Sequence, residues 1–260
     1  MTQSKKESVF RPIEGNKFKF LCHKEVPCFT KCCANLNLVL TPYDIVRMKT
    51  RLGISSEDFL EQYTSISFDR HPRFPMVFLK MNNDREKTCP FVTREGCSIY
   101  EDRPSACRIY PLGRASLWLP RHSRTKEDFF LVQETHCLGF QEDRVWTVQQ
   151  WMADQGLEEY NKMNDEWLEI LDFPRELGSK NEISLKIQMF YIGSYNLDKL
   201  RELIFKSKFF HLFELDNDLK TRLEADDVAL LKFSFDWLKF SLFGEKTIQV
   251  RRYGSHSIPG

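Results

Sequence analysis

The most informative segment of this chain runs Cys89-Pro-Phe-Val-Thr-Arg-Glu-Gly-Cys97-Ser-Ile-Tyr-Glu-Asp-Arg-Pro-Ser-Ala-Cys107-Arg-Ile-Tyr-Pro111. Its proline, glycine and aspartate residues predict loops and turns rather than a regular helix or strand. Cysteines on irregular backbone suit a metal centre, because metal ligands have to converge on one point from different directions. The segment therefore predicts a fold organised around cysteine ligands.

All eight cysteines lie in the first 137 residues of the 260-residue chain, and four of them fall between residues 22 and 33. The sequence from Met1 to Phe10 is polar and lacks the hydrophobic region of a signal peptide, so we expect a cytoplasmic location. Disulfides are rare in that reducing compartment, and the thiols are therefore expected to be available for metal or redox chemistry. The full set is Cys22, Cys28, Cys32, Cys33, Cys89, Cys97, Cys107 and Cys137.

The spacing of these cysteines favours an iron–sulfur cluster over zinc. A structural zinc ribbon usually has paired C-x2-C knuckles, and the sequence contains none. The thiolate-rich composition favours [4Fe–4S], while zinc and redox-active or unmetallated thiols remain alternatives. The observed spacings are Cys22-x5-Cys28-x3-Cys32-Cys33 and Cys89-x7-Cys97-x9-Cys107, followed by Cys137.

The adjacent pair Cys32-Cys33 bears on the number of sites. A disulfide between neighbours would strain the peptide unit that joins them, whereas adjacent thiolates can serve two irons or two neighbouring sites. Eight thiolates would suffice for two sites of four ligands. Neither group of cysteines alone offers a familiar four-ligand knuckle, so we expect the two groups to meet in space.

Composition narrows the range of partners. The chain has 38 Lys plus Arg against 37 Asp plus Glu, and 42% of its residues are hydrophobic. A net charge of +1 gives no electrostatic reason to expect nucleic-acid binding. No apolar run approaches the roughly 20 residues of a membrane helix, so no membrane span is expected.

We predict an α+β fold in which a small, irregular, cysteine-rich metal-binding domain with short helices and a few strands precedes a mainly α-helical region. The cysteine-cluster domain is expected at residues 1–140, a helical region packed on it at 141–245, and a flexible tail at 246–260. Thr41, Pro42 and Gly53 have the residue types of a helix N-cap, first turn and C-terminal stop. Further helices are expected to begin at Ser55 or Ser56, to run from Thr147 to just before Pro174, and to span about 182–192, 197–206 and 226–243, with strands at 74–81 and 129–133.

The strings PCFTKCC, LTPYDIVRM and CPFVTREGCSIYEDRPSACRIYPL, with the later Cys137, resemble the YkgJ-type cysteine-cluster proteins. That family is described as a zinc- or iron-chelating domain with eight cysteines, related to the cysteine-rich part of flagellin lysine-N-methylase. The resemblance covers roughly residues 20–140. It implies that all eight cysteines belong to the chelating set, and it implies little about a reaction.

Several residues near the cysteines could support a metal centre. A four-thiolate site keeps a formal charge of about −2, which a guanidinium can offset. Arg108, next to Cys107, is the first candidate for this role and Arg103 is the second, with a surface ion pair as the alternative for both. His23 and His136 each neighbour a cysteine and could replace a thiolate. Two tyrosines, Tyr100 and Tyr110, are expected to pack around the site.

Three functions remain open from the sequence. The favoured one is iron binding, as [4Fe–4S], for electron transfer or as part of an enzyme. The second is a zinc-stabilised module in which the helical half binds a protein partner. The third is a lysine methyltransferase, which would need S-adenosylmethionine. Phosphate-loop and dinucleotide-loop motifs do not occur in the sequence.

Overall fold

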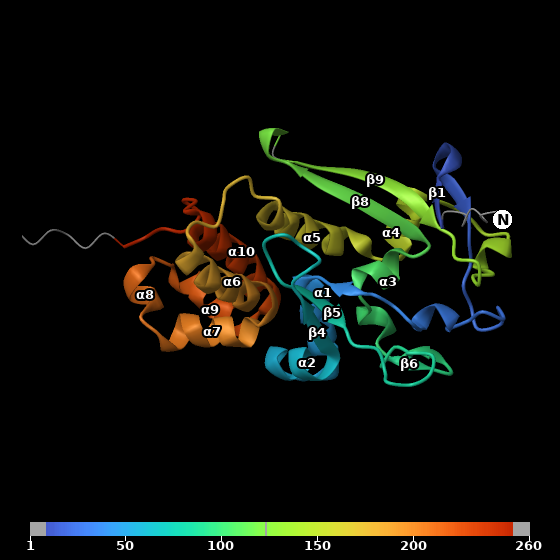
Figure 1. Ribbon diagram of the computed structural model, residues 1–260, viewed down its shortest axis with the longest axis horizontal. Coiled ribbons are helices and arrows are strands. Elements are labelled where there is room, and N and C mark those ends of the chain that lie inside the picture. Colours follow the sequence, from blue (N-terminus) through green and yellow to red (C-terminus); the bar gives the residue numbers. More distant parts are fainter. Residues whose placement is uncertain (1–8, 123, 252–260) are drawn as a thin grey trace, which may run out of the picture. The chain divides into compact units, whose positions relative to one another are not determined.

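The computed structural model describes residues 9–122 and 124–251 and has the α+β architecture expected from the sequence (Figure 1). It divides into two compact units. The first comprises Met1–Ile54 and Asp58–Phe173, and the second comprises Ser55–Glu57 and Pro174–Gly260. All eight cysteines belong to the first unit, which combines short helices with four small sheets.

The strands of the first unit form small antiparallel sheets rather than one continuous sheet. Strand orders are β1-β9-β8, β10-β2, β3-β5-β4 and β6-β7. The strands expected at 74–81 and 129–133 are present in β5 and β9. The bounds are β1 Phe10–Pro12, β2 Lys17–Lys19, β3 Val39–Leu40, β4 Thr64–Ser67, β5 Met76–Leu79, β6 Val92–Thr93, β7 Gly96–Cys97, β8 Leu112–Leu119, β9 Arg124–Val132 and β10 Val145–Thr147.

The longest strands, β8 and β9, form a hairpin in which Leu112 pairs with Leu131 and Leu119 with Arg124. Only its inner end is buried, with Leu112 in the core, whereas Leu117 is exposed. The mostly polar outer part gives β8 a weak hydrophobic pattern, so the sequence did not predict this strand. The hairpin fixes the position of the chain immediately after the last cysteine of the 89–107 group.

The first helix of the first unit begins and ends where its caps predict. Thr41 and Asp44 form a reciprocal capping box on the first helix, and Gly53 ends it in the left-handed conformation at φ 67°. The bounds are α1 Pro42–Leu52, α2 Ser56–Tyr63, α3 Ser105–Ile109, α4 Val148–Asp154 and α5 Leu157–Leu171.

The helix expected from Thr147 to just before Pro174 is two helices, α4 and α5. Gln155 ends α4, and Gly156 adopts φ 61°, which turns the chain before α5 begins. The residues Trp151, Leu157 and Tyr160 are all buried, but Trp151 lies six residues before Leu157, which does not fit one continuous helical face. This change of spacing and the glycine at position 156 were signals of the break that the prediction of one helix overlooked. The break directs the carbonyl of Gln155 toward the cysteine region, as described below.

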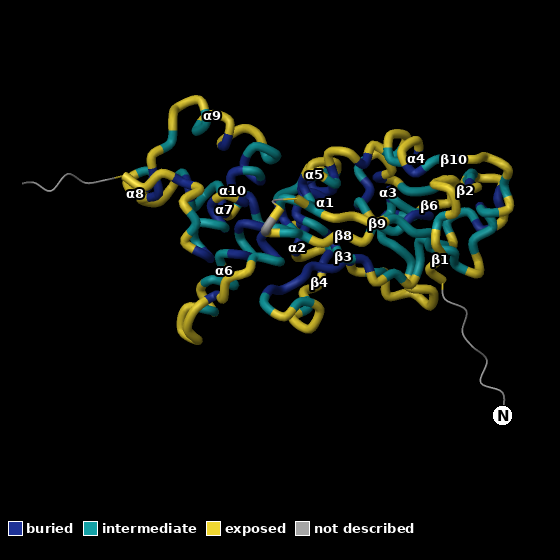
Figure 2. The backbone as a smooth tube through the Cα atoms, turned by 90° about the horizontal axis from the view of Figure 1, so that it is seen from above, coloured by how far each residue is buried: buried dark blue, intermediate teal, exposed yellow. Residues whose placement is uncertain are grey.

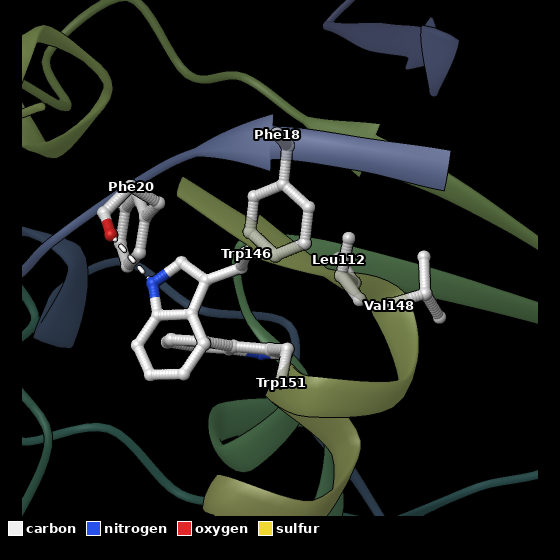
Figure 3. Close-up of a cluster of buried hydrophobic side chains, with 6 residues drawn as sticks. All are labelled: Phe18, Phe20, Leu112, Trp146, Val148 and Trp151. Atoms are coloured by element: carbon white, nitrogen blue, oxygen red, sulfur yellow. Dashed lines mark hydrogen bonds between the residues drawn. The ribbon is translucent and has the colours of Figure 1, made fainter. Parts of the chain in front are cut away.

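A cluster of aromatic residues forms the core beside the cysteines (Figure 3). The Nε1 of Trp146 donates a hydrogen bond of 2.8 Å to the carbonyl oxygen of Phe20, two residues before Cys22. Cys137 itself packs against this cluster. The core therefore fixes the chain close to the first cysteine, Cys22, and close to the last, Cys137. Its fully buried members are Phe18, Phe20, Leu112, Trp146, Val148 and Trp151.

The second unit is helical, and the helices expected near 182–192, 197–206 and 226–243 are present. Two short helices, α8 and α9, were not predicted. The central contact joins α6 and α10, where a Cβ added to Gly193 would lie 3.0 Å from the side chain of Leu238. The bounds are α6 Lys180–Tyr195, α7 Leu197–Lys206, α8 Phe209–Leu212, α9 Asn217–Ala225 and α10 Asp227–Phe243.

The core of the second unit includes α10, where Leu230, Leu231 and Leu238 are fully buried; buried residues are drawn in dark blue in Figure 2. Of the expected flexible tail, residues 252–260 lie outside the described part, whereas Ile248 is buried and Val250 forms a β-bridge with Phe213. Within the described ranges, helices are too short or too polar to cross a membrane.

We expect Trp151→Ala to lower the free energy of unfolding of the first unit by about 3–5 kcal/mol, because the side chain is only 6% exposed at the centre of the aromatic core. Leu117→Ala is the control: this side chain is 54% exposed, and its loss should change stability by less than about 0.5 kcal/mol. Urea unfolding of the two variants measures the difference. Equal effects would contradict the assignment of this core.

Candidate metal centre

The two groups of cysteines meet through the backbone. The amide of Cys89 donates a hydrogen bond of 2.8 Å to the carbonyl of Cys33, and the next residues out, Ala34 and Thr88, form an antiparallel β-bridge. A second approach lies nearby, because a Cβ added to Gly96 would lie 3.2 Å from the ring of Phe29. Segments separated by more than fifty residues are thus held side by side.

Cys32 and Cys33 lie on a single turn of 3-10 helix, η2, from Lys31 to Cys33. The amide of Cys33 donates to the carbonyl of Thr30, whose φ of 67° sets the start of the turn. Consecutive side chains on a helix of three residues per turn point about 120° apart. The two neighbouring thiols nevertheless lie within reach of each other, because a hydrogen bond joins their side chains.

The first set of thiols comprises Cys22, Cys28, Cys32 and Cys137, and we call it the outer group. The amide of Leu138 donates to the sulfur of Cys28 at 3.1 Å. The pKa of Cys22 is raised to about 11, first by burial and then by the nearby charges of Cys32, Cys28 and Cys137. The outer group therefore combines thiols from both ends of the cysteine region.

Close backbone packing brings Cys22 to Cys137. The amide of Leu21 donates to the carbonyl of Gly139 at 3.0 Å. A Cβ on Gly139 would lie 2.7 Å from the ring of Phe20 and 2.8 Å from the carbonyl oxygen of Leu21, so this approach requires glycine. Gly139 was not among the residues that the sequence singled out, and only its position two residues after Cys137 could have drawn attention to it.

The second set comprises Cys33, Cys89, Cys97 and Cys107, and we call it the inner group. Cys97 lies in β7, which pairs with β6 through Val92, and the amide of Val92 donates to the carbonyl of Cys89. A short hairpin thus presents two cysteines together. Cys107 lies in α3, directly after this hairpin region.

The surroundings of the inner thiols raise their pKa values and so favour the protonated, neutral form. Burial and then the nearby Cys89, Asp44, Cys97 and Cys32 raise the pKa of Cys107 to about 12. The pKa of Cys33 is raised first by a hydrogen bond with Cys32, then by burial, and then by the nearby charges of Cys32, Cys107 and Cys89. The same hydrogen bond lowers the pKa of Cys32. The vicinal pair is therefore the place where the two groups adjoin.

All eight cysteines are free thiols. Cys28 is buried, Cys22 is exposed and the other six are half-buried. In the described ranges, no three His, Cys, Asp or Glu side chains already lie close enough together to hold one metal ion. The two groups are therefore defined by backbone bonds and by mutual charge interactions. Their chemistry fits a thiophilic metal, which replaces the protons of crowded thiols with one shared positive charge.

The guanidinium of Arg103, rather than that of Arg108, has a charge interaction with the thiols. Its positive charge lowers the pKa of Cys97, although burial of that thiol raises the pKa more. The guanidinium lies 3.8 Å from the ring centroid of Tyr100 and donates to the side-chain oxygen of Gln155. It is 7% exposed and so acts within a partly dehydrated region.

Arg108 has a different environment from the one expected. It donates to the carbonyl of Gln155 at 2.6 Å and to the carbonyl of Glu101, and it lies 4.7 Å from the ring centroid of Tyr160. Neither a cysteine sulfur nor the carboxylate of Asp102 or Glu101 is among these partners. The carboxylate of Asp102 instead accepts a hydrogen bond from Arg47 at 2.9 Å.

The two histidines beside the cysteines face carboxylates. The Nε2 of His23 lies 3.5 Å from Glu142, and the Nε2 of His136 lies 3.4 Å from Glu134. Tyr110 packs on Phe20 and lies beside Cys137. The pKa of its phenol is raised first by burial and then by a hydrogen bond with the Cys137 thiol. Tyr100 is 53% exposed and packs on Arg103 rather than in the interior.

Asp44 is a buried residue that sequence reasoning did not select. Its side chain is fully buried and accepts bonds from the amides of Thr41 at 2.9 Å and Ser105 at 2.7 Å. One carboxyl group thereby joins the starts of α1 and α3, and α3 carries Cys107. The Thr41-x-x-Asp44 capping pattern was visible in the sequence, but the bond to Ser105, sixty-one residues away, was not.

Residues 21–138 match the model of the CxxCxxCC family, described as "Putative zinc- or iron-chelating domain". The first unit therefore contains a cysteine-cluster domain of the zinc- or iron-chelating class. Its first cysteines, Cys22-x5-Cys28-x3-Cys32-Cys33, depart from the spacing in the family's name. Comparison with curated proteins found no match, and comparison with solved structures also found none.

Metal affinity should increase as the pH rises through neutrality. With pKa values of about 11 for Cys22 and about 12 for Cys107, these thiols are protonated in the metal-free protein and have to release their protons to bind. We expect the Zn²⁺ association constant to rise by up to about tenfold per pH unit for each proton released. Competition with a chelator between about pH 6 and pH 8 measures this. A pH-independent constant would contradict thiolate ligation.

Proposed function

We propose that the cysteine-cluster domain binds iron as an iron–sulfur cluster, of the [4Fe–4S] type, and serves electron transfer. The observation that carries the proposal is the donor set. It consists of thiols, while the two candidate imidazoles, His23 and His136, face Glu142 and Glu134. Sulfur-only ligation is usual for [4Fe–4S] clusters.

The residues that would hold such a cluster are the four thiols of the outer group or of the inner group. A bound [4Fe–4S] cluster supplies a one-electron redox couple, whose potential depends on the charges and hydrogen bonds around its sulfurs. In this chain the amide of Leu138 donates to the sulfur of Cys28, and Arg103 places positive charge beside Cys97. Both contacts favour the more negative, reduced state.

The exposure of the outer group supports a role in transfer between proteins. Cys22 is exposed, so an electron donor or acceptor could approach the outer group directly. We also propose that the helical second unit binds a redox or protein partner. Its exposed apolar residues Leu185, Leu212 and Val250 support this part of the proposal.

Zinc is the second candidate, because the cysteine segments contain little regular structure. From Cys22 to Leu38 the secondary structure is the single turn η2 and one isolated β-bridge at Ala34. Coordination by Zn²⁺ could supply the ordering free energy that such loops need. The domain would then be a structural module and not a redox one.

Anaerobic purification of the full chain distinguishes the two candidates. An iron–sulfur protein should carry iron and acid-labile sulfide in equal amounts and show visible absorption that bleaches on chemical reduction. Zinc in place of iron, without visible absorption after iron and sulfide reconstitution, would contradict the proposal. The coarser conclusion of a chelating domain would stand in that case.

Two arginine variants provide a matched pair on the iron-loaded protein. Arg103→Gln should lower the reduction potential, because it removes positive charge beside Cys97 and Cys107. Arg108→Gln removes the bonds to the carbonyls of Glu101 and Gln155 and should mainly lower folding stability, by about 1–3 kcal/mol. Redox titration and urea unfolding of both variants check this. Equal shifts in potential for the two variants would contradict the assignment.

A further inference from the structure

We propose that the first unit contains a second ligand site, a polar hollow that binds a small molecule carrying a phosphate group. The hollow has a volume of about 470 Å³, which falls in the range of roughly 300–1,000 Å³ usual for small-molecule sites. Its described lining residues lie between Asn35 and Lys87 and include no cysteine. The inference therefore goes beyond the proposed function and does not depend on it.

The hollow lies on one face of the β3-β5-β4 sheet. Val39 of β3 and Ser65 of β4 both pair with Phe78 of β5. Successive side chains of a strand point to opposite faces, so Ser67 lies on the same face as Ser65. Lys80, directly after β5, lies on the same face as Phe78 for the same reason. The two serines, Phe78 and Lys80 line the hollow, so strand register fixes part of the site before any ligand binds.

Another part of the lining continues the junction between the two cysteine segments. The amide of Asn35 donates a hydrogen bond of 2.8 Å to the carbonyl of Lys87, one residue beyond the Ala34–Thr88 bridge. Both Asn35 and Lys87 have positive φ angles, 53° and 52°, which residues other than glycine adopt rarely. Such conformations persist only where the surrounding structure holds them, and they are frequent at ligand sites. Both residues line the hollow.

Positive charge in the hollow exceeds negative charge. The lining includes three basic side chains, those of Arg70, Lys80 and Lys87. Within the described ranges Arg70 and Lys87 form no ion pair, and Lys80 donates a hydrogen bond of 2.6 Å to the carbonyl of Glu61. The one acid of the lining, Asp69, already accepts a hydrogen bond from Ser67. An anion between the three cations would remove their mutual repulsion.

A phosphate group suits these donors better than a carboxylate does. The guanidinium of Arg70 lies 5.8 Å from the ring centroid of Phe78, a contact that helps to orient its planar donors. Amide and hydroxyl side chains line the hollow from other segments, among them those of Asn35, Asn37 and Ser65. A phosphate group carries a charge of about −1.5 to −2 at pH 7, and its oxygens accept hydrogen bonds from several directions. A carboxylate has a smaller charge and accepts in one plane.

Calorimetric titration of the full chain with pyrophosphate tests the proposal. Arg70→Gln with Lys87→Gln removes two of the three cations and should weaken binding at least about tenfold, because hydrogen bonds from charged donors are lost. The control is Arg124→Gln with Lys126→Gln, which changes the net charge equally at exposed residues of β9. It should change the affinity by less than about twofold, since salt screens distant exposed charges.

A second measurement uses the wild-type protein and so does not depend on the folding of a variant. Acetylation of lysines, located by mass spectrometry, is compared with and without pyrophosphate. Lys80 and Lys87 should be acetylated more slowly when pyrophosphate is present, whereas the rate at Lys126 should be unchanged. Citrate, which carries carboxylates and no phosphate, should protect these two lysines less at the same concentration.

Three results would overturn the inference. The first is equal affinity of the two double variants for pyrophosphate, which would place the anion elsewhere, for example on bound metal. The second is acetylation of Lys80 and Lys87 at the same rate with and without pyrophosphate. The third is equal protection by citrate, which would reject a phosphate ligand. Metal content is measured separately, so that a protein without metal counts against the proposed function and not against this site.

Discussion

The hydrogen bond from the amide of Cys89 to the carbonyl of Cys33 is the contact on which the cysteine region depends. It joins two irregular segments that could not otherwise define a site, because each is too short to bury a core of its own. The Ala34–Thr88 bridge extends this junction, and the contact of Phe29 with Gly96 supports it from the other side. Every thiol of the inner group lies on one of the two joined segments.

The outer group depends on the aromatic core instead. Trp146 bonds the carbonyl of Phe20, and Gly139 allows the segment after Cys137 to approach Leu21. These contacts fix the two ends of the cysteine region against β2, β10 and α4. The geometry of the thiols is therefore set partly by ordinary hydrophobic packing, which persists when thiols are protonated, and partly by the short bonds near η2.

The sequence predicted the parts of the fold that depend on local signals. The start and end of α1 follow from Thr41, Pro42 and Gly53, and the α+β class follows from the change in pattern after Cys137. The break at Gly156 was missed because apolar residues continue on both sides of it, although Trp151 and Leu157, six residues apart, do not share one helical face. The boundary between the compact units, after Phe173, places α4 and α5 with the cysteines. Such a boundary depends on contacts that periodicity does not record.

The candidate site shows the same limit. The cysteines could be chosen from spacing and residue type, but which of them lie together depends on long-range backbone contacts such as the bond from the Cys89 amide to the Cys33 carbonyl. Similarly, Arg108 was chosen for its position next to Cys107, whereas its guanidinium bonds the carbonyl of Gln155, forty-seven residues away. Arg103, five residues earlier than Arg108, has the charge contact with the thiols.

The central claim is that sulfur alone binds the metal. X-ray absorption at the metal edge of the loaded full chain tests it most directly, because nitrogen, oxygen and sulfur neighbours are distinguished by distance and scattering. The account predicts four sulfur neighbours per metal atom at about 2.3 Å and no lighter ligand. A nitrogen or oxygen neighbour at about 2.0–2.2 Å, as from His23 or His136, would contradict it.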